Sequence, residues 1–138
     1  LARVGFDNTL GYLKGGMNSW KKAAKTLDTV EGIEVANFKP LAEKEQLNIF
    51  DVRKPGEYLS EHLIDANNTP LDFLNNHMSE FPTEGHFYLH CAGGYRSMIA
   101  ASILKSRGIH NLIDVRGGFT AIKKGKMKVS DYVCPSTI

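Results

Sequence analysis

The chain has 138 residues, of which 42% are hydrophobic and 23% charged, which fits one globular domain and excludes a disordered or collagen-like protein. Seventeen basic and fifteen acidic residues leave a net charge of +2, too small to indicate a nucleic acid or an anionic membrane as partner. No apolar run is long enough for a helix that spans a bilayer. The two cysteines, Cys91 and Cys134, are too few for a disulfide scaffold, so we expect a reducing, cytoplasmic setting.

The sequence predicts helices and strands that alternate along the chain. In order, the patterns predict a helix-like segment over 21–26, a linker over 28–32, a short strand over 33–35, a helix from Asn37 to Gln46, a central strand over 47–52, a charged loop over 53–60, a helix over 71–80, a second central strand over 86–90, a helix over 98–105 and a third strand over 112–115. Asn37 is the expected helix cap. This alternation predicts an α/β fold with a largely parallel sheet flanked by helices.

Two segments of the chain resemble each other. Residues 5–22 and 108–124 both carry Gly-apolar-x-Asn, then Gly-Gly, then a Lys-Lys pair at the end of a helix-like stretch. Coincidence is one interpretation, because these pairs are common. The other is a duplicated domain, in which residues 1–30 are the tail of a preceding repeat with a linker and residues 31–138 form a complete domain.

The segment 91–97, Cys-Ala-Gly-Gly-Tyr-Arg-Ser, joins the second central strand to the next helix, where open α/β sheets bind their ligands. Its two glycines allow a tight curl with inward N–H groups, and the helix offers its positive end. Arg96 adds a forked cation. This anion-binding loop should favour the thiolate of Cys91, which makes that residue a candidate nucleophile. The alternative is that Cys91 is a small buried residue and the glycines only turn the chain.

The other candidate residues are weaker. Asp51 and Arg53 end the first central strand, where they either orient the cysteine loop or form a structural ion pair. His62 either lies on the rim of the site or is a packed histidine. His90 should face away from Cys91, because successive residues of a strand point to opposite sides.

No metal-binding set is evident, because the five histidines are scattered and none pairs at ligand spacing. We therefore expect neither a metal nor another cofactor. Cys134 lies in the C-terminal tail beside Pro135, where it is either a resolving thiol or a bystander.

Several short motifs occur together in a fixed order. They are Asp-Val-Arg at 51–53, Pro-Gly-Glu-Tyr at 55–58, His62, Ala-Asn at 66–67, Thr-Pro-Leu at 69–71, the loop at 91–97 and Gly-Gly-Phe at 117–119. On these motifs, residues 33–124 resemble a rhodanese (sulfurtransferase) domain. The family pattern usually has Gly before the histidine and Ile-Pro-Gly-Ala after it, whereas here Glu61 precedes His62 and Leu-Ile-Asp-Ala follows at 63–66.

The resemblance implies a rhodanese-like three-layer fold with a central, mostly parallel sheet between helices. It also implies that Cys91 accepts a sulfane sulfur as a persulfide and that Arg96 closes the loop and binds an anionic donor. The remaining substrate-binding residues would be Ala92, Gly93, Gly94, Tyr95 and Ser97. Residues 1–30 resemble the end of a preceding rhodanese-like domain, as in bacterial fusions with a metallo-β-lactamase-fold domain, so we expect a covalent link to an upstream domain.

Three functions remain open. A sulfurtransferase of the thiosulfate:cyanide type would pass sulfur from thiosulfate or a small persulfide to a thiol or cyanide in a ping-pong cycle. A non-catalytic sulfur carrier or docking module of a larger metallo-β-lactamase-fold hydrolase or persulfide dioxygenase would have the same loop. A cysteine phosphatase or arsenate reductase fits less well, because only four residues separate Cys91 from Arg96 and no general acid is evident.

Overall fold

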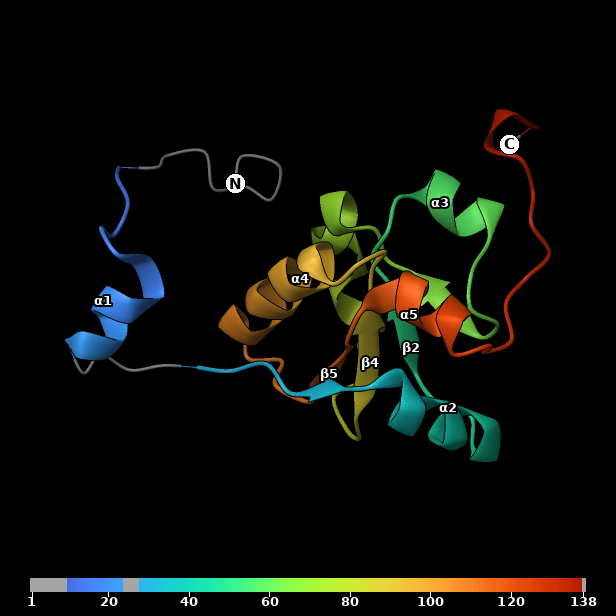
Figure 1. The fold of residues 1–138 in the computed structure, drawn as a ribbon, viewed down its shortest axis with the longest axis horizontal. Helices are drawn as coiled ribbons and strands as arrows, with labels where there is room; N and C mark the ends of the chain where they lie inside the picture. The colour runs from blue at the N-terminus through green and yellow to red at the C-terminus, as the bar shows by residue number, and fades with distance from the viewer. Residues whose placement is uncertain (1–9, 24–27, 138) are drawn as a thin grey trace.

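The computed structural model describes residues 10–23 and 28–137, and its centre is one parallel sheet (Figure 1). The strands are β1 (Gly32–Ile33), β2 (Ile49–Asp51), β3 (Ala66–Asn68), β4 (Phe87–His90) and β5 (Leu112–Val115). They lie in the order β1-β5-β4-β2-β3, and every pairing is parallel. The strands β2, β4 and β5 are buried throughout. Their near-continuous apolar sequences are typical of parallel strands in a sheet that is covered on both faces.

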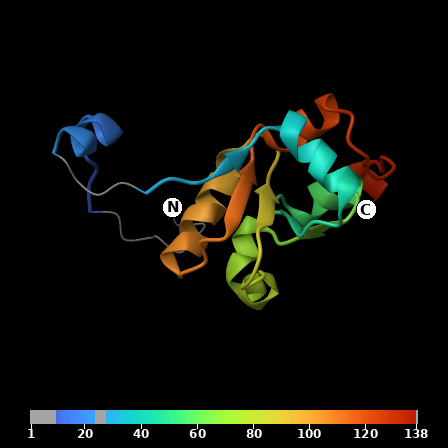
Figure 2. The same ribbon diagram turned by 90° about the horizontal axis from the view of Figure 1, so that it is seen from below.

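Helices cover both faces of this sheet. The helices of the described residues are α1 (Gly16–Lys22), α2 (Val35–Lys44), α3 (Pro55–Ser60), η2 (Leu71–Glu80), α4 (Tyr95–Ser106), α5 (Gly118–Lys124) and η3 (Pro135–Thr137), of which η2 and η3 are 3₁₀ helices. The side chains of α4 and η2 pack on one face and those of α2 and α5 on the other. Figure 2 shows the resulting three layers, which confirm the predicted fold class.

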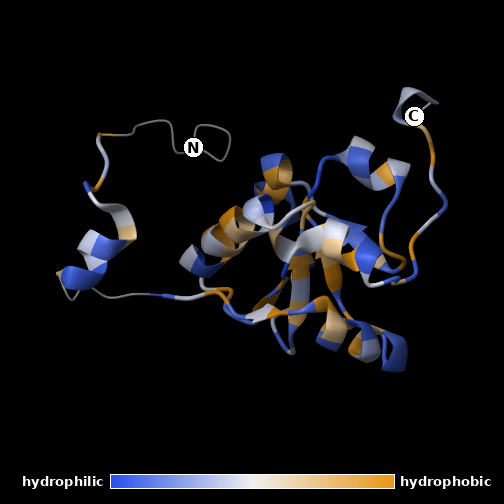
Figure 3. Cartoon of the chain, in the orientation of Figure 1, coloured by the Kyte–Doolittle hydropathy of each residue, from blue (hydrophilic) through white to orange (hydrophobic). Residues whose placement is uncertain are grey.

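The core is divided in two by the sheet, because successive residues of a strand point to opposite faces. Phe87 and Leu89 of β4 pack against Leu104 of α4, while Tyr88 packs with Phe38 of α2 on the other side. Figure 3 shows apolar residues concentrated on the strands and the inner sides of the helices. Each large apolar side chain buried in this way contributes about 1.5–3 kcal/mol.

Several predicted boundaries are wrong. The expected loop over 53–60 contains α3, which starts at Pro55, a residue well suited to the first position of a helix. Asn37 does not cap α2; it lies inside the helix, whose cap position is Glu34. The start of α4 is Tyr95, three residues before the expected start, and β3 was not predicted at all.

The helix α1 stands apart from the sheet in Figures 1 and 2, and none of its residues is buried. The predicted domain boundary near residue 30 stays a prediction, since residues 1–9 and 24–27 lie outside the described part. Across 10–23 and 28–137, no helix has the length and apolar character needed to cross a membrane.

Candidate active site

Cys91 follows the last residue of β4, and only 1% of its surface is exposed. Its Sγ accepts a hydrogen bond of 3.1 Å from the backbone N–H of Gly94 and lies 3.6 Å from the Oγ of Ser97. The Ser97 hydroxyl in turn donates to the Gly94 carbonyl oxygen at 3.2 Å. Gly94 has φ +113°, in the left-handed region that favours glycine, and this lets its N–H turn towards the sulfur. The loop is therefore built around the sulfur atom.

The second half of the predicted loop is helical. Tyr95, Arg96 and Ser97 form the first turn of α4, a helix of 12 residues, so the loop itself covers only 91–94. The positive end of the α4 dipole lies next to the sulfur, where it stabilises negative charge. Tyr95 is 81% exposed, so its side chain does not enclose the buried sulfur.

The first turn of α5 holds the loop from the other side. The backbone N–H groups of Phe119 and Thr120 donate to the carbonyl oxygens of Cys91 at 2.7 Å and Ala92 at 3.1 Å. Gly118 allows this approach, because a Cβ atom at that position would collide with the backbone of Cys91 and Ala92. The Gly-Gly-Phe motif thus supports the cysteine loop, a role that the sequence analysis did not assign.

Arg96 is held by a carboxylate. Its Nη1 and Nη2 donate to Oε2 and Oε1 of Glu57 at 2.7 and 3.0 Å, a bidentate pair. This hydrogen bonding lowers the pKa of Glu57 and raises that of Arg96. Glu57 was part of a recognised motif, but its pairing with Arg96 across 39 positions was not foreseen. A Pro at the first position of α3 with Glu at the third was the signal that could have placed Glu57 at a helix start.

Asp51 and Arg53 form a buried ion pair on the opposite face of the sheet from Cys91. The Nη2 of Arg53 lies 2.6 Å from Oδ2 of Asp51, and Nε bonds both carboxylate oxygens. The guanidinium also lies over the ring of Phe119, 4.1 Å from its centroid. The predicted ion pair is therefore present, and it braces the α5 residue that contacts the cysteine loop.

The three other histidine and cysteine side chains considered for the site point away from the sulfur or lie far from it. His62 stacks on Tyr58, with ring centroids 3.9 Å apart, so it is a packed histidine. His90 faces the Asp51 side, as predicted, and burial lowers its pKa. Cys134 is exposed in the tail, where hydrogen bonding with Ser136 lowers its pKa.

One buried carboxyl beneath the site was not predicted. Asp114 of β5 is 5% exposed, its Oδ1 has no hydrogen-bond partner, and burial raises its pKa. A hydrogen bond with Ser97 lowers this pKa in part and connects Asp114 to the surroundings of Cys91. A single Asp in an apolar strand was the only signal in the sequence.

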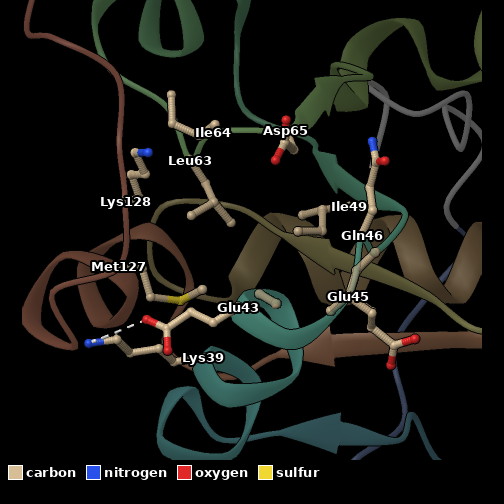
Figure 4. Close-up of a pocket in the computed structure, with 12 residues that line it drawn as sticks. Lys39, Glu43, Glu45, Gln46, Ile49, Leu63, Ile64, Asp65, Met127 and Lys128 are labelled. Atoms are coloured by element: carbon tan, nitrogen blue, oxygen red, sulfur yellow. Dashed lines mark ion pairs between the residues drawn. The ribbon is translucent and has the colours of Figure 1, made fainter.

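A separate hollow of about 220 Å³ lies at the amino ends of β2 and β3, the opposite end of the sheet from Cys91 (Figure 4). Apolar side chains such as Ile49, Leu63 and Met127 line it together with charged residues of α2. No cysteine, serine, threonine or histidine is among its lining residues. Over the described ranges, no three His, Cys, Asp or Glu side chains are grouped closely enough to hold a metal ion.

A buried thiol at the carboxyl end of a parallel strand, enclosed by a short glycine loop and two helix starts, defines an α/β protein with a cysteine-centred site. The family model described as the Rhodanese-like domain matches residues 34–125. The chain therefore belongs to the rhodanese-like family, and the predicted resemblance is confirmed.

Named relatives agree with this family. The chain is 35% identical over 71 residues to the Uncharacterized protein YqhL of Bacillus subtilis and 31% identical over 81 residues to a Sulfurtransferase of Allochromatium vinosum. These matches cover 51% and 59% of the chain. The chain spans 56% of the length of YqhL and 76% of the length of the Allochromatium protein. A crystal structure of a rhodanese-related protein from Thermoplasma volcanium is similar to 72% of this chain, and the match covers 97% of the Thermoplasma chain. The TM-score is 0.65 at 24% sequence identity, which supports the fold.

Proposed function

We propose that this chain is a sulfurtransferase that carries a sulfane sulfur as a persulfide on Cys91. The observation that supports this most directly is the environment of Sγ, which is buried and accepts the Gly94 N–H at 3.1 Å. An anionic sulfur needs hydrogen-bond donors around it, and preorganised backbone N–H groups supply them at little cost. The name of the Allochromatium relative, Sulfurtransferase, agrees with this function.

The proposed reaction has two steps. The Cys91 thiolate attacks the outer sulfur of the donor, the sulfur–sulfur bond of the donor breaks, and its electron pair leaves with the departing thiolate or sulfite. A thiol or cyanide acceptor then attacks the outer sulfur of Cys91–S–S⁻ and releases the Cys91 thiolate. No external oxidant or reductant is required, because the sulfane sulfur keeps its oxidation state in both steps.

Each loop residue has a proposed part. Ala92, Gly93 and Gly94 enclose the transferred sulfur with backbone N–H groups, and the Ser97 hydroxyl turns from the Gly94 carbonyl to donate to the anionic form. Arg96 orients the loop and the incoming donor. We propose Asp51, Arg53 and His62 only as supports of the surrounding structure, since the ion pair is buried and the histidine is stacked on Tyr58.

A sulfur carrier is the second candidate. The chain is 31% identical over 106 residues to a protein of Bacillus subtilis named Putative sulfur carrier protein YrkF, and it spans 55% of that protein. In this case Cys91 would form the same persulfide, and a partner would be needed for turnover. The metallo-β-lactamase-fold fusion, the upstream rhodanese-like repeat and a cytoplasmic location remain proposals for the longer protein.

The proposed function is tested by turnover. Native protein and Cys91→Ala are assayed with thiosulfate, with a small thiol persulfide and with a phosphomonoester, each with a thiol or cyanide acceptor where needed. We expect sulfur release from at least one sulfur donor by the native protein alone, and none by Cys91→Ala. A persulfide that forms but does not turn over would favour the carrier, and Cys91-dependent phosphate release would support a phosphatase.

A further inference from the structure

The charge of Arg96 is already matched before any donor enters. The bidentate contact with Glu57 occupies both terminal nitrogens of the guanidinium. Glu57 is fixed in turn, because its Oε2 also accepts the backbone N–H of Lys54 at 3.1 Å, as an acid at the third position of a helix does. The pair is partly exposed, and the carboxylate is held on one side by Arg96 and on the other by the start of its own helix.

The guanidinium of Arg53, on the other face of the sheet, is matched as well. Arg53 is paired with Asp51, so the two arginines and the two carboxylates have a summed charge of zero. Lys54 and Asp72, which line the small hollow beside Arg96, also have opposite charges. The loop therefore offers backbone N–H groups and a helix end, but neither Arg96 nor Arg53 provides a net positive charge for a doubly charged ligand.

This charge balance separates two classes of donor. Thiosulfate carries two negative charges that must lose water when it enters the loop, and this is unfavourable where no net positive charge compensates it. A thiol persulfide carries at most one charge on the transferable sulfur pair, which the N–H groups of the loop can bind. The same loop without Glu57 would suit the dianion better.

We propose that Glu57 is a specificity-determining residue that screens Arg96 and thereby directs the site towards thiol persulfides and away from thiosulfate. This inference rests on the proposed sulfur transfer to Cys91. The Cys91 thiolate attacks the outer sulfur of R–S–SH, the donor S–S bond breaks, and RS⁻ leaves with the electron pair while the new Cys91–S–SH forms.

The test compares Glu57→Gln with the native protein, with Glu61→Gln as the matched control. Glu61 lies one turn further along the chain and pairs with Lys123 instead of Arg96. The donors are thiosulfate and 2-hydroxyethyl persulfide, whose carrier group is uncharged. We expect Glu57→Gln to raise kcat/KM for thiosulfate about tenfold, which corresponds to about 1.4 kcal/mol, and to change the persulfide value less than about threefold. Equal changes for both donors, or the same result for Glu61→Gln, would overturn the proposal.

A binding measurement tests, without any turnover, whether Glu57 screens the charge of Arg96. Sulfate, a stable dianion, is titrated into Cys91→Ser and into Cys91→Ser combined with Glu57→Gln, and the amide resonances of residues 92–97 are followed by NMR. We expect about tenfold tighter sulfate binding when Glu57 is replaced, and this gain should shrink with added sodium chloride. Unchanged affinity would overturn the inference even if the sulfur transfer is real. Conversely, tighter sulfate binding without any donor turnover would contradict the proposed function and leave the screening by Glu57 supported.

Discussion

The backbone N–H of Phe119 donates a hydrogen bond of 2.7 Å to the carbonyl oxygen of Cys91. This contact joins the start of α5 to the proposed nucleophile, and Thr120 makes the corresponding contact with Ala92. Both contacts depend on Gly118, which has φ +59° and lies against the loop backbone. The last motif of the domain therefore determines how the first residues of the cysteine loop are held.

Gly118→Ala should displace the cysteine loop. The new Cβ would meet the backbone of Cys91 and Ala92, and the left-handed backbone adds strain, so we expect a loss of about 1–3 kcal/mol in the free energy of unfolding. Alkylation of Cys91 by iodoacetamide should change in rate as well. Gly85→Ala is the control, since Gly85 also has a positive φ, +72°, but faces open space. Urea unfolding measures the free energy of unfolding of both variants. If Gly118→Ala loses no more of it than Gly85→Ala does, this account is contradicted.

Arg53→Met should be strongly destabilising. It leaves the carboxylate of Asp51 buried without its ion-pair partner, and such a change costs about 3–5 kcal/mol. The double variant Asp51→Leu, Arg53→Met removes both charges and should recover most of that loss. Chemical denaturation of the single and double variants measures the difference. If the double variant were as unstable as the single one, packing of Arg53 on Phe119 and not the unpaired charge would explain the effect.

The central strands could be predicted because parallel strands buried on both faces have continuous apolar sequences. β5 has the predicted boundaries, and β4 starts one residue later than predicted. β3 was missed, since Ala66–Asn68 lies at the edge of the sheet and its sequence, Ala-Asn-Asn, has no apolar alternation. α3 was missed because residues 53–60 were interpreted as a charged loop, although Pro55 also favours the first position of a helix.

For the site, the strand-to-helix position of Cys91 was sufficient to identify the loop, since local sequence determines it. The partner of Arg96 could not be identified in this way, because Glu57 comes from another element of the chain. The same holds for Asp114, whose burial depends on α4 packing over β5. Contacts between distant segments are the part of the site that the motifs did not reveal.

Asp114 should make stability fall as the pH rises. Burial raises its pKa, so the unfolded chain loses this proton from about pH 4, before the native protein does. In that window the free energy of unfolding decreases until Asp114 has ionised in the native state too. The side chain of Asp114→Asn cannot ionise, so this variant does not lose stability in that way. Its free energy of unfolding, relative to that of the native protein, should therefore increase as the pH rises above about 4.

Urea unfolding over a pH series measures this difference. Asp131→Asn, at an exposed position, serves as the control and should follow the native pH dependence. A constant difference between Asp114→Asn and the native protein across the series would contradict the raised pKa of Asp114.

Removal of residues 1–27 should leave the domain folded. No residue of α1 is buried, whereas the Nζ of Lys105 contacts Asp28 at 2.8 Å and so ties the linker to α4. We expect the shortened protein to retain its free energy of unfolding to within about 0.5 kcal/mol. A protein that starts at Glu34 lacks β1 and the bond from the Asp114 N–H to the Glu31 carbonyl, and should be clearly less stable. If both shortened proteins lost the same free energy of unfolding, the domain boundary would lie elsewhere.

The most direct test of sulfur transfer is intact-mass spectrometry with peptide mapping. The protein is incubated with 2-hydroxyethyl persulfide or thiosulfate, desalted and analysed, alongside Cys91→Ala and Cys134→Ala. We predict one added sulfur, located on Cys91, retained in Cys134→Ala, absent from Cys91→Ala and removed by cyanide. Sulfur on the exposed Cys134 instead, or no added sulfur with either donor, would contradict the account.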